Sequence, residues 1–397
     1  MKQLHRITCG LLAAVIAISA IGCQQAAPPP RKSQAARAQE NVQAAEAVRA
    51  EQHPELRRSA VQDDRVAKNL REGKEPYAHL MGYRPERQQS EQFIHSLPAP
   101  TFRQAAPQLF QARGPPTANE YAAGEPILLY RALNTAHQRK FGSLWSPETQ
   151  EIGDCVSHGW SLACNVDLAV QFCLGKSDDF QLVATEAVYG LSRVEARGLT
   201  INRGGDGSYG AAAAKAVTLF GVPFRFDYRN VGSTECDLRD YSGSRARNWG
   251  MYGCGGRSDQ GRLDQVCKLH PVYQVALVTT WEETKAAHEN GYAIAVCSGQ
   301  GFTYATDANG FAYPRGSWAH CMCSVGIRYD IEGVLIANSW GPDWIDQSRG
   351  KYPADMPPGC FWCPRKTWER MIAGRDTYVV SRVKGFPRQR LQLVEGL

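Results

Sequence analysis

An apolar, strand-like segment at residues 334–337 runs directly into Asn338-Ser339-Trp340-Gly341. A second strand-like segment lies at residues 327–330, and Glu332-Gly333 supplies a turn between the two. This pattern predicts a β-hairpin that carries His320 on its first strand and ends its second strand at Asn338. A hairpin is a rigid support, so the imidazole and the amide would be held in a fixed relation to each other.

A cysteine lies upstream, at Cys155, and apolar residues spaced for one helix face follow it as far as Phe172. The pattern predicts a buried helix that begins at Cys155, where the helix N-terminus would stabilise a thiolate. A free thiol has a pKa of about 8.5, so a nearby imidazole such as His320 is needed to hold it ionised. Asn338 would fix the tautomer of that imidazole, and Trp340 would shield their hydrogen bond from water.

In this order, Cys155, His320 and Asn338 resemble the catalytic residues of the papain-like cysteine peptidases. The match includes the spacing after His320, where Gly326 falls at the family's position. The resemblance implies an α+β fold, with a helical half that bears the cysteine and a β-barrel-like half that bears the histidine and asparagine. The active site would lie in the cleft between them. It also implies a peptidase that works through a thioester acyl-enzyme on peptide or protein substrates, without a cofactor.

Two features near the nucleophile depart from the family pattern. The family has a glutamine six residues before its cysteine, which shares the oxyanion hole with the backbone N–H of the nucleophile. Gln150 lies five residues before Cys155, so this role requires a shorter loop. Val156 replaces the aromatic residue that usually follows the nucleophile.

A glycine-rich stretch at residues 203–210, followed by a helix-like segment that ends at Gly221, resembles the family's substrate loop. Gly205 and Gly207 are the candidates to pair with an extended peptide, and Trp340 is a further candidate substrate contact. A glycine cluster of this kind is equally typical of an ordinary loop.

Each of these residues also has a purely structural interpretation. A buried cysteine is usually a small hydrophobic residue, and Asn-Ser-Trp-Gly can be a simple exit from a strand. His158 is a rival imidazole three residues after Cys155, and Cys164 is predicted to lie in the core. Two other functions stay open. One is an inactive relative that binds peptides; the intact Cys155, His320 and Asn338 argue against it, and the displaced Gln150 keeps it open. The other is a different exported thiol hydrolase, such as a cell-wall amidase or a transglutaminase-like enzyme.

The first 22 residues predict export. Residues 1–6 are basic, residues 7–18 are apolar but too short to span a membrane comfortably, and small residues precede Cys23. The arrangement resembles a bacterial lipoprotein signal, in which Cys23 is lipid-modified and becomes the first mature residue. The alternative is a plain export signal. We therefore expect a cell-envelope lipoprotein, or else a periplasmic or extracellular protein.

Residues 23–119 are rich in Ala, Gln, Glu and Arg, and they predict a tether followed by an exposed helix from about Gln39 to Glu72, ended by Gly73. The mixed charges and the modest net charge of +6 argue against a nucleic-acid partner. We expect a linker, with an inhibitory propeptide as the alternative. Residues 120–388 would then form one peptidase domain, and residues 389–397 a tail.

The chain contains 13 cysteines, and removing Cys9, Cys23 and Cys155 leaves ten. In an exported protein some of these should form disulfides, although the sequence alone does not give their connectivity. Cys360 and Cys363 have the spacing of metal ligands, but no second pair matches it, so we expect no metal. Cys297 is a candidate wall residue of the substrate cleft.

Overall fold

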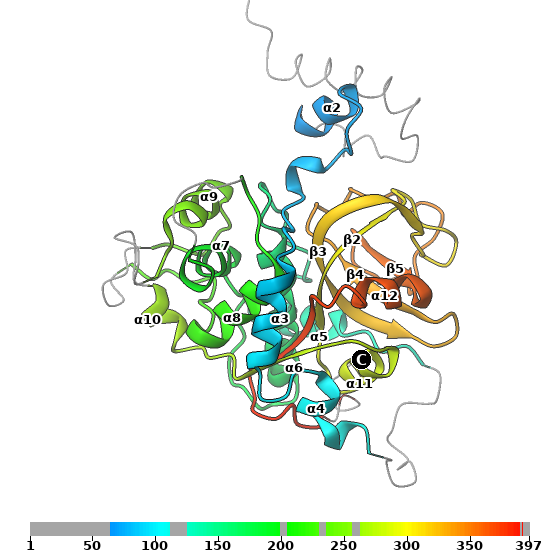
Figure 1. Ribbon diagram of the computed structural model, residues 1–397. Helices are drawn as coiled ribbons and strands as arrows, with labels where there is room; N and C mark the ends of the chain where they lie inside the picture. Colours follow the sequence, from blue (N-terminus) through cyan, green and yellow to red (C-terminus); the bar gives the residue numbers. More distant parts are fainter. Residues whose placement is uncertain are drawn as a thin grey trace, which may run out of the picture.

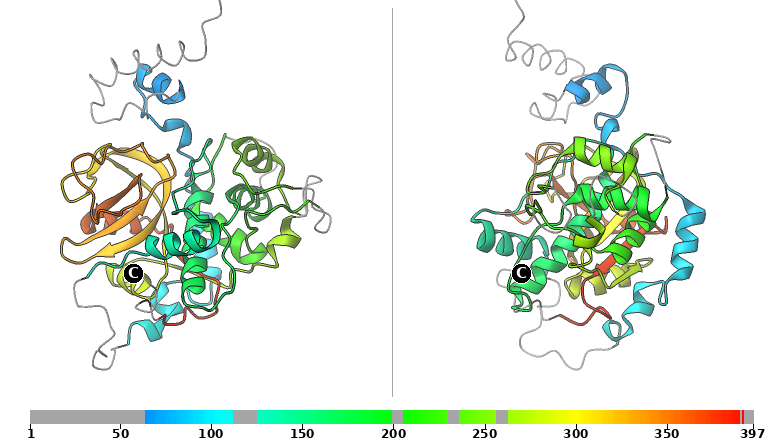
Figure 2. Two further views of the ribbon diagram at one scale, coloured as in Figure 1. Left: turned by 180° about the vertical axis from the view of Figure 1, so that it is seen from behind. Right: turned by 90° about the vertical axis from the view of Figure 1, so that its left-hand side faces the viewer.

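Helices and strands separate into two halves of the molecule, which lie side by side in Figure 1 and, seen from behind, in Figure 2. The computed structural model describes residues 64–111, 125–198, 205–229, 236–255, 263–389 and 391. The helices of the first half are α5 (Tyr130–Phe141), α6 (Cys155–Cys173), α7 (Thr185–Gly190), η4 (Leu191–Ala196), α8 (Gly210–Phe220), α9 (Gly243–Tyr252) and α10 (Leu263–Cys267). The separation into a helical and a sheet half confirms the predicted α+β class.

Helix α6 lies at the junction of the two halves. Its first four turns are buried almost throughout, and it packs against α5, α7 and strand β3. A helix that is apolar on several faces is stable only when it is covered on several sides. The predicted buried helix beginning at Cys155 is therefore confirmed, and so is the helix that ends at Gly221, which is α8.

The second half is an antiparallel sheet with the strand order β1-β6-β2-β3-β4-β5. Its strands are β1 (Gln274–Leu277), β2 (Ile294–Phe302), β3 (Pro314–Arg328), β4 (Gly333–Ala337), β5 (Cys360–Pro364) and β6 (Thr377–Ser381). Strands β3 and β4 form the predicted hairpin. The sheet is open, which differs from the barrel-like closure expected. Helices α11 (Trp281–Glu289) and α12 (Arg365–Ile372) pack against it and cover apolar surface that closure would otherwise bury.

Residues 64–111 lead from α2 (Asp64–Arg71), which projects from the body of the protein in Figures 1 and 2, to segments that lie against the body. They also contain η2 (Ala78–Leu80), α3 (Arg87–Ser96), α4 (Phe102–Ala105) and η3 (Pro107–Leu109). Helix α2 ends at Arg71, close to the predicted end at Gly73, and Gly73 has the left-handed φ of 66° that is common just after a helix. From there the chain passes between the two halves and continues into α3 on the outside of the body (Figures 1 and 2).

The predicted signal segment, Cys23 and the rest of the helix expected from Gln39 lie outside the described residues. Among the helices that the structure describes, none is both long and apolar enough to cross a membrane.

Candidate active site

The β3–β4 hairpin brings His320 and Asn338 together. His320 Nε2 lies 2.7 Å from Asn338 Oδ1, and both side chains are buried. The backbone N–H of Ser339 donates to the same oxygen at 2.8 Å, which fixes the amide so that its oxygen faces the ring. Nε2 is therefore the protonated nitrogen, and Nδ1 is left to exchange a proton. The Trp340 ring packs on the imidazole, with 4.5 Å between ring centroids.

Cys155 is the first residue of α6, and its sulfur is fully buried. Helix α6 packs closely on β3 at Gly159. A methyl group added at Gly159 would lie only 2.9 Å from the carbonyl oxygen of Met322, so there is no room for a side chain. The thiol accepts a hydrogen bond from the backbone N–H of Gly82 at 3.4 Å. His320 Nδ1 makes no hydrogen bond within the described part of the chain, so the thiol and the imidazole are not hydrogen-bonded to each other.

Burial sets the charge of both groups. It raises the pKa of the Cys155 thiol, and the neighbouring Cys321 adds to the rise. Burial also lowers the pKa of His320 to about 3, although the hydrogen bond to Asn338 opposes this. Both pKa shifts favour the neutral forms of the two groups, whereas nucleophilic attack requires the ionised thiolate–imidazolium pair.

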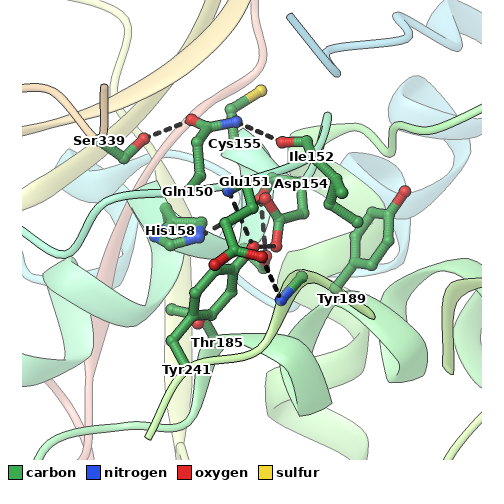
Figure 3. A network of polar contacts seen from close by, with 12 residues as sticks. Gln150, Glu151, Ile152, Asp154, Cys155, His158, Thr185, Tyr189, Tyr241 and Ser339 are labelled. Carbon is green, nitrogen blue, oxygen red and sulfur yellow. Dashed lines mark hydrogen bonds and ion pairs between the residues drawn. The ribbon is translucent and has the colours of Figure 1, made fainter. Parts of the chain in front are cut away.

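Gln150 links the two halves next to the nucleophile (Figure 3). Its Nε2 donates to the carbonyl oxygens of Leu80 at 2.8 Å and Ile152 at 2.7 Å, and its Oε1 accepts from Ser339 Oγ at 2.6 Å. Both amide protons are thus engaged, one of them by a residue of the N-terminal part of the chain. The carbonyl of Leu80 therefore accepts the Gln150 N–H that the sequence comparison with the family assigns to the oxyanion hole.

Leu80 belongs to a stretch that we call the crossing segment, residues 75–86, which runs between the two halves over Cys155. Its backbone makes hydrogen bonds to both halves of the molecule, as an added β-strand would. On the helical side the N–H of Ser208 donates to the carbonyl of Gly82 at 2.9 Å, and Arg84 N–H donates to the carbonyl of Ser208 at 2.7 Å. On the sheet side Tyr83 N–H donates to the carbonyl of Ala319 at 2.9 Å, next to His320.

The crossing segment fits over the nucleophile because glycines line its path. A Cβ added at Gly82 would lie 1.7 Å from the carbonyl oxygen of Gly153, so the two backbones are in direct contact. A Cβ added at Gly207 would lie 2.4 Å from the carbonyl oxygen of Gly82. Of the two predicted substrate glycines, Gly207 therefore touches the crossing segment. Gly205 has open space on its Cβ side, and its carbonyl accepts from Arg193 Nη1 at 3.0 Å.

Tyr83 of the crossing segment lines a cavity together with Cys297, Ala319 and Asp376. Burial raises the pKa of Tyr83, and the charge and hydrogen bonding of Asp376 add to the rise. Asp376 is itself buried and accepts backbone N–H bonds from Gly210 and Ala211 at 2.8 Å each, at the start of α8. Burial raises the pKa of Asp376 to about 6. Sequence reasoning missed this aspartate, because nothing adjacent to it marks the helix start that it faces.

His158, the rival imidazole, lies on the helical side of the polar network that Figure 3 shows. Its ring nitrogens lie 3.5 Å from Asp154 Oδ1 and 3.6 Å from Glu148 Oε2, and Tyr241 Oη donates to Asp154 Oδ2 at 2.9 Å. Burial lowers the pKa of His158, but Asp154 and Glu148 outweigh it, so the net shift is upward. The Cys155 sulfur points away from this ring in Figure 3. Cys164 lies in the core, as predicted.

By sequence, the chain matches no protein-family model and no curated protein. By structure, it is similar to xylellain, a cysteine protease from Xylella fastidiosa, with 16% identity, 76% of this chain and 91% of that chain covered, and a TM-score of 0.41. It is also similar to proCathepsin B S9 from Trypanosoma congolense (11% identity, 77% and 87% covered, TM-score 0.44). A third similar structure is digestive procathepsin L 3 of the Tenebrio molitor larval midgut (15%, 87% and 99%, 0.42).

Proposed function

We propose that the protein is a papain-like cysteine peptidase in which Cys155 is the nucleophile, His320 the proton carrier and Asn338 the residue that orients it. The observation that carries this proposal is the 2.7 Å contact of His320 Nε2 with Asn338 Oδ1, beneath Trp340 and on the hairpin whose strand β3 packs against α6. This contact leaves Nδ1 to take the thiol proton, as general base chemistry requires.

The reaction follows from these positions. Once a substrate replaces the crossing segment, Cys155 passes its proton to His320 Nδ1, and the thiolate attacks the peptide carbonyl. The developing oxyanion accepts from the Cys155 backbone N–H and from the Gln150 amide proton that Leu80 now holds. His320 then protonates the leaving amine, and water hydrolyses the thioester with His320 again as base.

We further propose that the crossing segment keeps the enzyme inactive, which favours the propeptide alternative for this part of residues 23–119. Three contacts support the idea. The N–H of Gly82 bonds the thiol, the carbonyl of Leu80 occupies the Gln150 amide, and Tyr83 forms part of the wall of the cavity that Asp376 also lines. Burial also favours the neutral forms of Cys155 and His320, which are inactive. Removal of the segment would let water solvate the thiolate and the imidazolium.

The direct test is Cys155→Ala, made both in the full chain and in a Gly82→Ala chain, whose crossing segment no longer fits. Peptidase activity on denatured protein, and labelling by an epoxide-type thiol inhibitor, should appear in the Gly82→Ala chain and vanish when Cys155 is also replaced, while both full chains stay inactive. Activity that survives the loss of Cys155 would refute the assignment. Hydrolysis of peptidoglycan stem peptides in place of denatured protein would favour the cell-wall amidase, and binding without cleavage would favour an inactive relative.

A further inference from the structure

Two buried thiols face each other beside the nucleophile. Cys297 on β2 and Cys321 on β3 are directly opposed in the antiparallel register, and their sulfur atoms lie 2.6 Å apart. Both side chains are almost completely buried. This separation is well inside the roughly 3.5–4.0 Å at which even carbon atoms make their best contact, and sulfur is the larger atom.

The backbone suits a covalent link between them. Directly opposed residues of an antiparallel pair have Cα atoms roughly 4.5–5.5 Å apart, and disulfides span Cα separations of about 4.4–6.8 Å. The two strands can therefore be bridged without moving. We propose that Cys297 and Cys321 are a disulfide site, which closes when the protein meets an oxidising thiol–disulfide couple.

The oxidant in this proposal is a small-molecule disulfide such as oxidised glutathione. One cysteine thiolate attacks it, which forms a mixed disulfide and releases one glutathione thiolate. The second cysteine thiolate then attacks the protein sulfur of that mixed disulfide, which forms the Cys297–Cys321 bond and releases the second glutathione. The two protein thiols lose two protons and two electrons, and one glutathione disulfide becomes two glutathione thiols.

Other roles for the pair are less consistent with its surroundings. In the described part of the chain, no group of three or more His, Cys, Asp or Glu side chains is arranged to hold a metal ion. Cys323, two residues further along β3, provides a contrast, because it is opposed by Ala295 on one side and Ala337 on the other. Of these two β3 cysteines, only Cys321 has a thiol directly opposite.

The Cys297–Cys321 pair lies next to the proposed active site, so a disulfide between these residues would affect that site. Cys321 follows His320 directly, and both its thiol and its backbone N–H act on the Cys155 sulfur, so it is a neighbour of the nucleophile. Cys297 lines the same cavity as Tyr83. The disulfide would therefore brace the strand that carries His320 and remove the thiol beside Cys155, which leaves the nucleophile reduced in an oxidising compartment.

The test maps cysteines and needs no peptidase activity, so its outcome is independent of the proposed function. The full chain is refolded in a glutathione redox buffer, alkylated under denaturing conditions and digested without reduction for mass spectrometry. The dominant cross-linked product should join the peptides of Cys297 and Cys321, with Cys155 alkylated. The Cys323→Ala variant should give the same product, and Cys297→Ala should lose it.

A second measurement compares thermal midpoints before and after reduction. Reduction should lower the midpoint of the wild-type and Cys323→Ala proteins by several degrees, and the Cys297→Ala/Cys321→Ala protein should lack this shift. Recovery of Cys297 and Cys321 in alkylated form from the oxidised wild-type protein, or their linkage to other cysteines, would overturn the proposal. The wild-type map decides the question even if the variants fail to fold.

Discussion

At the scale of single residues, the proton transfer depends on which ring nitrogen of His320 is free. Asn338 Oδ1 accepts the Nε2 proton, with 2.7 Å between nitrogen and oxygen, so loss of this oxygen should allow the wrong tautomer and ring rotation. We expect Asn338→Ala to lower the kcat/KM of the released enzyme by about 10²–10⁴, the usual contribution of a positioned general base. Asn290→Ala is the matched control, because this buried amide donates to the carbonyl of Ala286 on the preceding helix. Equal losses in the two variants would argue for a purely structural role of Asn338.

Gln150 allows a second test at this scale. Removal of one oxyanion-hole donor typically costs about 10²–10³ in kcat. Gln150→Ala should therefore reduce kcat to this extent with little change in KM. Gln347→Ala is the control, because its buried amide donates to the carbonyl of Cys360 on the sheet, away from the nucleophile. An unchanged kcat in Gln150→Ala would assign the oxyanion to other donors.

At the scale of elements, the fit of the crossing segment depends on backbone contact at Gly82. The methyl group of Gly82→Ala would overlap the carbonyl of Gly153, and overpacking of this kind costs about 1–3 kcal/mol. Because the strain is confined to the closed form, kcat/KM should rise by roughly tenfold or more when measured before any cleavage. In Gly73→Ala the added methyl meets nothing within 4 Å, so the crossing segment should stay in place and this control should stay inactive. Its only expected cost is local backbone strain at the φ of 66°.

The same elements show what the sequence could predict. The helix beginning at Cys155 and the hairpin carrying His320 and Asn338 follow from local periodicity and turn residues, and both are present. The path of the crossing segment could not be foreseen, because its contacts join Gly82 to residues more than 70 positions away. The open sheet was missed for a related reason, since strand patterns do not reveal whether the edge strands meet.

At the scale of the whole molecule, the crossing segment separates the catalytic residues from the predicted lipid anchor along the chain. If Cys23 is acylated, cleavage within residues 75–86 would activate the enzyme and, where the remaining N-terminal contacts dissociate, also release it from the membrane. We expect the uncleaved protein in the membrane fraction of its host and the cleaved, active form in the soluble fraction. Cys23→Ser should make both forms soluble, whereas Cys9→Ser, within the removed signal, should change neither. Membrane attachment that survives Cys23→Ser would contradict a lipid anchor at this residue.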